Sequence, residues 1–222
     1  MSDLFEAAAV EAFFPTPVWI QDVRPARASP LNARAIRDLD AMTSPRPELA
    51  PGQNWQTEQN LHTFAEFAGL VEIFEAGTRE ALDFLAVEHD GFEITGCWAN
   101  LSPPGRSHRV HSHANNFLSG VYYVQTAPGA DTISFHDPRV QIEQIAPRVG
   151  ERNAFNSNAC HVPVRAGQLV MFPSWLAHSV PENTSDMLRI SISFNIMFTD
   201  FTGVISRPRW SGIPLRRNAA RE

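Results

Sequence analysis

The sequence predicts an α+β fold that is mostly β, with helices in the first part of the chain and a β core in the second. Apolar residues recur at helical spacing within residues 30–43 and 59–88. After residue 90 the chain breaks into short β-rich runs, separated by turn sequences such as PPG, APGA and RAGQ. Helices that precede strands in this way are typical of a fold in which they pack against one β core. We therefore expect one domain, residues 1–222, made of an N-terminal strand and helical support (1–90), the β core (91–205) and a C-terminal tail (206–222).

The first part of the chain is expected to support the β core. Residues 13–23 are predicted to form an isolated strand behind two prolines, and residues 30–43 a short helix. Residues 59–88 have the clearest helical periodicity. Gly69 and Gly77 are expected to weaken this helix enough to split it in two.

The β core has its clearest strand near its end. In RISISFNIMF the residues Ile190, Ile192 and Phe194 alternate with more polar neighbours, which is the pattern of a half-buried strand. Several short strands of this kind favour a sandwich or a barrel over a parallel sheet. Residues 141–160 are polar and irregular, and a long loop of this type is typical of a lid or a binding segment.

The composition excludes several classes of protein. The net charge is −6 and only 19% of residues are charged, which argues against nucleic acid as a partner, because phosphate binding needs clustered Lys and Arg. No apolar run approaches the roughly 18 residues of a membrane span, and the N-terminus lacks the pattern of a signal peptide. Cys97 and Cys160 are too few for a disulfide scaffold. We expect no membrane partner and a cytoplasmic location.

Histidines cluster just before an apolar, strand-like segment. On a strand, residues i and i+2 face the same side, so His111 and His113 would point together and His108 would face the other way. His178 follows an apolar strand and a Pro-containing turn, from which it can return to the same barrel mouth. Imidazole nitrogens are common metal ligands. We therefore expect His111, His113 and His178 to bind a metal ion.

Arg189 is the candidate for binding an anion. It lies at the start of the last clear strand, eleven residues after His178, and Ser191 faces the same way two positions later. A guanidinium beside a hydroxyl is a suitable receptor for a carboxylate. Because Leu188 and Ile190 flank it in a mostly apolar strand, we expect the arginine to point inward toward an anion.

Together these features resemble the double-stranded β-helix of the iron(II)- and 2-oxoglutarate-dependent oxygenases. That superfamily carries His-x-Asp/Glu after an early strand and a distal His. An Arg follows, often within Arg-x-Ser, and binds the far carboxylate of 2-oxoglutarate. The matching positions here are His111, His178, Arg189 and Ser191.

Several segments also resemble a family of uncharacterised bacterial and phage proteins described as 2-oxoglutarate/iron(II) oxygenases. These segments are FFPTPVW, NWQT, CWANLSPPG, HSHANNFLSGVYYV, FHDPR, GQLVMFPSWLAHSVPEN and RISISFNIMF. The resemblance spans most of the chain and is more specific in the second half. It implies a jelly-roll, cupin-like barrel with the N-terminal helices packed on it. It also implies a dioxygenase, and we expect a hydroxylase that uses Fe(II) and 2-oxoglutarate.

The chain departs from the superfamily pattern at one metal ligand. His113 stands where the pattern has a carboxylate. The third ligand is therefore His113 itself, Asp137, Asn115 or water, and we favour His113. Three imidazoles leave the metal site one unit more positive than two imidazoles and a carboxylate would, which favours an anionic chelator.

The resemblance also implies how the co-substrate binds. 2-Oxoglutarate would chelate the metal through its C1 carboxylate and keto oxygen, with its C5 carboxylate on Arg189, helped by Ser191. Tyr123 or Asn100, on neighbouring strands, would add a hydrogen bond. The primary substrate is expected to be a small molecule or a peptide that the sequence does not identify. The N-terminal helices either form a homodimer surface, which we favour slightly, or only cover the barrel.

An alternative function shares the barrel but not the chemistry. Gly105, followed after five residues by His111-x-His113, resembles the opening of a cupin motif. The glutamate usual after that opening is missing, because Asn116 and Phe117 stand in its place. A three-His cupin metalloprotein would be a thiol dioxygenase, an isomerase or a binding module. Such a protein has no need for the Arg-x-Ser pair, so this function ranks second.

Overall fold

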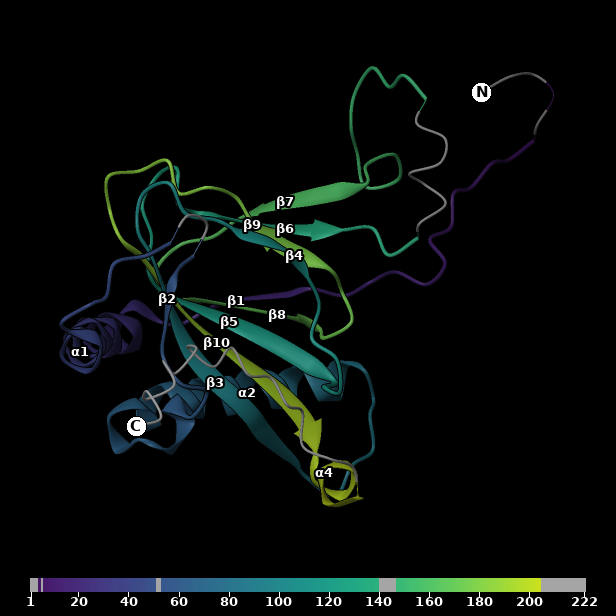
Figure 1. The fold of residues 1–222 in the computed structure, drawn as a ribbon. Helices are drawn as coiled ribbons and strands as arrows, with labels where there is room; N and C mark the ends of the chain where they lie inside the picture. Colours follow the sequence, from purple (N-terminus) through teal and green to yellow (C-terminus); the bar gives the residue numbers. More distant parts are fainter. Residues whose placement is uncertain (1–3, 5, 51–52, 140–146, 205–222) are drawn as a thin grey trace, which may run out of the picture.

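The computed structural model describes residues 4, 6–50, 53–139 and 147–204 (Figure 1). The expected C-terminal tail (206–222) and residues 141–146 of the expected loop lie outside this part of the chain. Two sheets form the β core, and every pair of neighbouring strands in them is antiparallel. This architecture confirms the predicted mostly-β fold of two packed sheets with N-terminal helices.

The larger sheet has six strands and the smaller sheet has four. In spatial order the larger contains β1 (Trp19–Asp22), β8 (Gln168–Pro173), β5 (Leu118–Gln125), β10 (Arg189–Phe198), β3 (Phe92–Ser102) and β2 (Trp55–Gln56). The smaller contains β4 (His108–His111), β9 (His178–Val180), β6 (Thr132–His136) and β7 (Ala159–Pro163). In Figure 1 the smaller sheet lies across one face of the larger sheet, and helices α1 and α2 lie on the opposite face of the larger sheet.

Strand β10 is buried on both faces, although its alternation predicted a half-buried strand. Phe194 faces the helices, and its ring stacks on Phe74 with centroids 4.3 Å apart. The intervening side chains of Ser191, Ser193 and Asn195 face the smaller sheet and are also buried. A polar inner row looks like a solvent-facing row in the sequence, but here it lines the space between the two sheets.

The helices begin and end differently from the prediction. Helix α1 runs from Pro25 to Thr43, so it begins five residues before the expected start. Helix α2 covers only Ala68–Phe84, because the residues before it form two short 3-10 turns, η1 (Leu61–Thr63) and η2 (Ala65–Phe67). A final short helix, α4, spans Thr199–Val204.

Gly69 and Gly77 were expected to split the helix, but α2 is continuous through both of them. The two glycines instead let α2 pack closely against its neighbours. A Cβ atom on Gly69 would lie 2.8 Å from Leu31 of α1, and one on Gly77 would lie 2.6 Å from Leu169 of β8. The helices therefore cover the larger sheet, as expected if they pack on the barrel. The alternative role, a homodimer surface, stays a prediction. No described helix is both long and apolar enough to cross a membrane.

Candidate metal and co-substrate site

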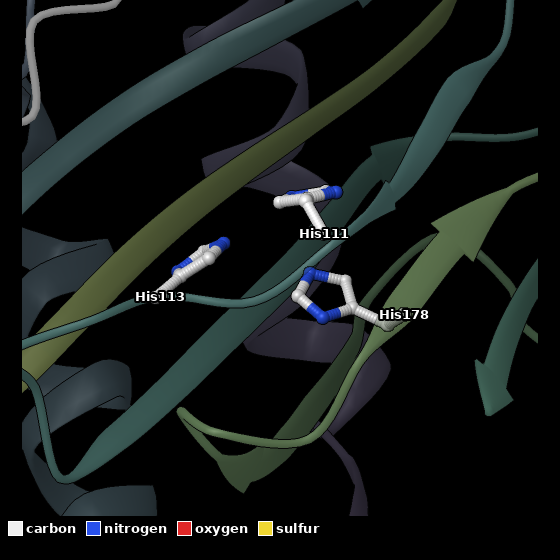
Figure 2. Close-up of side chains that lie close together, drawn as sticks. All are labelled: His111, His113 and His178. Carbon is white, nitrogen blue, oxygen red and sulfur yellow. The ribbon is translucent and has the colours of Figure 1, made fainter. Parts of the chain in front are cut away.

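The structure brings the three predicted histidines together at one end of the barrel. His111 ends β4 and lies opposite His178, the first residue of β9, while His113 follows β4 in a turn. Their rings face one another (Figure 2), with centroid distances of 5.2, 4.3 and 5.1 Å. One ligand nitrogen from each ring lies within 4.8 Å of the others. The cluster is therefore compact enough for one ion to contact all three rings.

Strand alternation predicted that His111 and His113 would lie together, but His113 lies outside the strand, so alternation is not the reason that they meet. Strand β4 ends at His111, and the backbone then turns so that the amide of His113 donates to the carbonyl of Ser174 at 2.8 Å. Ser174 directly follows β8, so this bond ties the turn to the larger sheet. The rings of His111 and His113 converge because the turn after β4 is hydrogen-bonded to the turn after β8.

The alternation predicted that His108 would face away from the cluster, but Nε2 of its ring is buried and the ring interacts electrostatically with the cluster. The β4–β9 ladder is irregular between His108 and His111, which breaks the two-residue period. His108 is coupled electrostatically to Arg189, to His111 and to His178. The irregular register therefore accompanies a His108 ring that is near both the metal cluster and the arginine.

The hydrogen bonds of the rings set which nitrogen carries the proton. Nδ1 of His111 lies 2.8 Å from the carbonyl oxygen of Arg109, and Nδ1 of His178 lies 3.0 Å from that of Leu176. A carbonyl only accepts, so each Nδ1 bears the hydrogen and the lone pair of the neutral ring is on Nε2. Outer contacts of this kind orient histidines that bind metal ions.

His113 is held by a buried polar network that the sequence analysis missed. Its Nδ1 donates to Oδ1 of Asn195 at 2.6 Å, and Ser119 Oγ lies 3.1 Å from the same nitrogen. The Ser119 hydroxyl also donates to Asn195 at 2.8 Å and contacts Ser174 Oγ at 2.8 Å. The period of β10 places Asn195 on the same face as Arg189, and that was the available signal.

Replacing Asn195 with alanine is expected to lower Mn(II) affinity about 10- to 100-fold, because it removes the acceptor that orients His113. Isothermal titration calorimetry under anaerobic conditions measures this affinity. Ser193→Ala is the matched control, because Ser193 lies on the same face of β10 but accepts from Asn100 instead. Equal affinities for the two variants would show that the network does not act on the metal site.

Burial keeps two of the cluster histidines neutral. It lowers the pKa of His113 to about 4 and that of His178 to about 3, and nearby His111 lowers both further. The side chains are 6% and 4% exposed respectively. A neutral imidazole is the form that binds a metal ion. At neutral pH, protons therefore compete little for these two rings.

The metal-free protein is expected to lose stability as the pH falls below about 6.5, the pKa of an unfolded histidine. Between that value and the depressed folded pKa of His178, the unfolded state binds the extra proton and gains population. This residue alone should cost about 2 kcal/mol between pH 7 and pH 5. Urea unfolding at both pH values measures the loss, and His178→Gln should reduce it. An identical loss in the variant would contradict the assignment.

No carboxylate joins the cluster within the described residues. Asp137 instead forms an ion pair with Arg139 at 2.6 Å, and that arginine's hydrogen bonds lower the pKa of its carboxyl. Asn115 follows in the turn with a positive φ of 58°. Of the histidine and carboxylate alternatives for the third ligand, His113 lies in the cluster and Asp137 does not.

Arg189 is buried without a protein counter-ion. Its side chain is 2% exposed, and Nε has no hydrogen-bond partner among the described residues. No carboxylate in that part of the chain forms an ion pair with the guanidinium. Burial lowers the pKa of Arg189. An unpaired buried charge is costly, so this position favours a bound anion.

The other three predicted co-substrate residues form one row across the larger sheet. Ser191 on β10 lies opposite Asn100 on β3 and opposite Tyr123 on β5. Facing positions on neighbouring strands put their side chains on the same side. Tyr123 is coupled electrostatically to Arg189. Asn100 already donates to Ser193 and accepts from Gln56, so the fold itself uses both ends of its amide.

A barrel of two antiparallel sheets, with a histidine cluster at its end and a buried arginine on its last strand, defines the class of the 2-oxoglutarate- and iron(II)-dependent oxygenases. Residues 96–195 match the family described as "Putative 2OG-Fe(II) oxygenase". The matched segment runs from β3 to β10 and contains the whole histidine cluster and the arginine.

Solved structures of the same class share the fold. The non-heme alpha ketoglutarate dependent carbocyclase SnoK from nogalamycin biosynthesis is 16% identical, with a TM-score of 0.61 over 82% of this chain and 80% of that chain. HygX from Streptomyces hygroscopicus, solved with nickel and 2-oxoglutarate, is 12% identical, with a TM-score of 0.57 over 83% of each chain. A Pseudomonas putida prolyl-4-hydroxylase is 18% identical, with a TM-score of 0.57 over 82% of this chain and 93% of that chain. No curated protein matches the chain.

These findings confirm the first of the two predicted functions. The chain is a 2-oxoglutarate/Fe(II)-dependent oxygenase with a histidine triad, and Fe(II) and 2-oxoglutarate are its cofactor and co-substrate. It therefore takes at least one small molecule, 2-oxoglutarate itself. The three-His cupin alternative is set aside, because the family match is to an oxygenase that uses 2-oxoglutarate.

Proposed function

We propose that His111, His113 and His178 hold the iron, and that Arg189 with Ser191 binds the C5 carboxylate of 2-oxoglutarate. The observation that carries this proposal is the compact cluster, with its ligand nitrogens within 4.8 Å of one another, in the same barrel as a buried arginine without a counter-ion. Neutral nitrogen donors suit Fe(II), and a guanidinium suits a carboxylate.

Each protein group has a separate task in this proposal. The carbonyls of Arg109 and Leu176 fix two ligand rings, and Asn195 fixes the third. Arg189 neutralises the far end of the co-substrate, while Tyr123 beside it supplies a hydroxyl at the same end. The bound iron supplies the activation of dioxygen, coupled to the conversion of 2-oxoglutarate to succinate and carbon dioxide.

The three-imidazole ligand set fits an anionic co-substrate. Neutral ligands leave the full charge of the divalent ion on the site, and Arg189 adds another positive charge. No described carboxylate belongs to the cluster or pairs with the arginine. A dianion such as 2-oxoglutarate balances this charge better than a neutral ligand would.

The proposed reaction on the primary substrate is hydroxylation of a small molecule or a peptide. His111 is the exposed member of the cluster, and beside it Val110 is 56% exposed. Trp175, in the turn before β9, is 55% exposed. These apolar side chains are available to contact a substrate that approaches the metal from solvent.

The wild-type protein is expected to develop a weak visible charge-transfer band when Fe(II) and then 2-oxoglutarate are added without oxygen. Admitting oxygen should then release succinate, even without the primary substrate, at a slow rate. Absorbance spectroscopy and succinate quantification measure the two results. Arg79→Ala is the matched control, because Arg79 is an exposed arginine of α2 outside the site. The absence of both band and succinate would count against the proposed function.

A further inference from the structure

Two buried polar groups near Arg189 have no partner in the described chain. The side chain of Ser102 is fully buried, and its hydroxyl oxygen makes no hydrogen bond there. Nε2 of His108 is likewise buried and unpartnered, as is Nε of Arg189 itself. Buried polar groups are normally satisfied, so three such atoms in one region point to a missing ligand.

Ser102 lies beside the arginine by strand register. Arg189 on β10 and Ser102 on β3 are direct partners in the antiparallel ladder. Side chains at such positions share a face, with Cβ atoms about 5 Å apart. The end of β3 is also fixed, because Asn183 donates its side-chain amide to the carbonyl of Ser102 at 2.9 Å. Ser102 is therefore held opposite Arg189, with its side chain on the same face of the sheet.

His108 approaches the same place from the smaller sheet. The turn before it is closed by Gly105, whose φ of +76° suits glycine, and by the amide of Gly105 donating to the carbonyl of Asn183 at 2.8 Å. His108 interacts electrostatically with Arg189 and with two members of the metal cluster. It is therefore near enough to both the metal cluster and the arginine to interact with each of them.

The chemistry of the three groups matches one carboxylate. A guanidinium, a hydroxyl and an imidazole N–H all donate hydrogen bonds, and a carboxylate only accepts them. Burial beside the arginine lowers the pKa of His108 to about 4, so the ring is neutral near pH 7 and serves as a donor without adding a second positive charge. A single anionic group would satisfy all three donors together.

We propose that Ser102 and His108 complete, with Arg189, the receptor for the distal carboxylate of the co-substrate. They thereby set the preference for 2-oxoglutarate over 2-oxo acids that lack this carboxylate. This inference rests on the proposed function, and it assigns the receptor two residues outside the Arg-x-Ser pair.

Calorimetry of the Mn(II)-loaded protein without oxygen tests the assignment with two ligands. 2-Oxoglutarate carries the distal carboxylate, and 2-oxopentanoate has the same carbon chain with a methyl group in its place. Ser102→Ala and His108→Phe are each expected to weaken 2-oxoglutarate binding roughly tenfold and to leave 2-oxopentanoate binding unchanged. His108→Gln, which keeps an N–H near the position of Nε2, should retain more affinity than His108→Phe. His161→Phe, at an exposed position on β7, is the control that should behave as wild type.

The melting temperature supplies a second readout. Because the hydroxyl of Ser102 has no described partner, Ser102→Ala should melt at or above the wild-type temperature without ligand, yet gain less from added 2-oxoglutarate. The inference is overturned if the variants weaken both ligands equally, or weaken neither. If Arg189→Ala loses 2-oxoglutarate while these variants keep it, only this inference fails. If the wild type does not discriminate between the two ligands, the proposed function fails as well.

Discussion

Replacing Arg189 with alanine is expected to weaken 2-oxoglutarate binding about a hundredfold or more, because truncating one partner of a buried charge pair leaves the other buried and unpaired. Arg189 is 2% exposed and has no carboxylate partner among the described residues, so the co-substrate is its best counter-ion. Calorimetric titration of the Mn(II)-loaded protein measures the change. Binding of Mn(II) itself should change little, because Arg189 is not part of the histidine cluster.

The controls separate charge from geometry. Arg189→Lys keeps the positive charge but loses the planar fork, so it should recover part of the lost affinity. Arg79→Ala, on an exposed face of α2, should bind as wild type. If Arg189→Ala binds 2-oxoglutarate as tightly as the wild type, the arginine has no role in co-substrate binding.

Replacing His178 with alanine is expected to abolish specific metal binding, because it removes one of three donors that no other described group can replace. The loss should exceed the 10- to 100-fold expected for an outer contact such as Asn195. Mn(II) that binds only the folded state is expected to raise the melting temperature of the wild type, and this gain should disappear in the variant. Differential scanning fluorimetry with and without Mn(II) measures it.

The matched control for His178→Ala is a histidine elsewhere in the smaller sheet. His161 on β7 is exposed and contacts Ser134, outside the cluster. His161→Ala should keep the full metal-dependent gain in melting temperature. If His178→Ala kept that gain as well, a metal site centred on the three histidines would be excluded.

Much of the fold could be predicted because its signals are local. Alternation along 189–198 indicated the central strand, and helical spacing in 30–43 and 59–88 indicated the two main helices. The ends of these helices were less predictable. The expected split at Gly69 and Gly77 did not occur, because whether a glycine breaks a helix or lets it pack closely depends on the neighbour it meets in space.

The candidate site was predictable where residue type and spacing carried the signal. His111, His178 and Arg189 follow a recognisable order along the chain, and the structure gathers the predicted histidines at one end of the barrel. The side of the strand that His108 faces was not predictable from alternation, because the period of two holds only while the strand is regular.

The sequence by itself determined which strands and helices form, and which imidazoles and guanidinium are available for a metal and an anion. Only the tertiary structure decided which residues orient these groups and which lie beside them. The acceptor for His113 is Asn195, which is 82 residues away in the chain, and the neighbour of Arg189 across the sheet is Ser102. The physical reason is that periodicity fixes the face of a residue within its own element, whereas its partners depend on strand register and on turns that join distant segments.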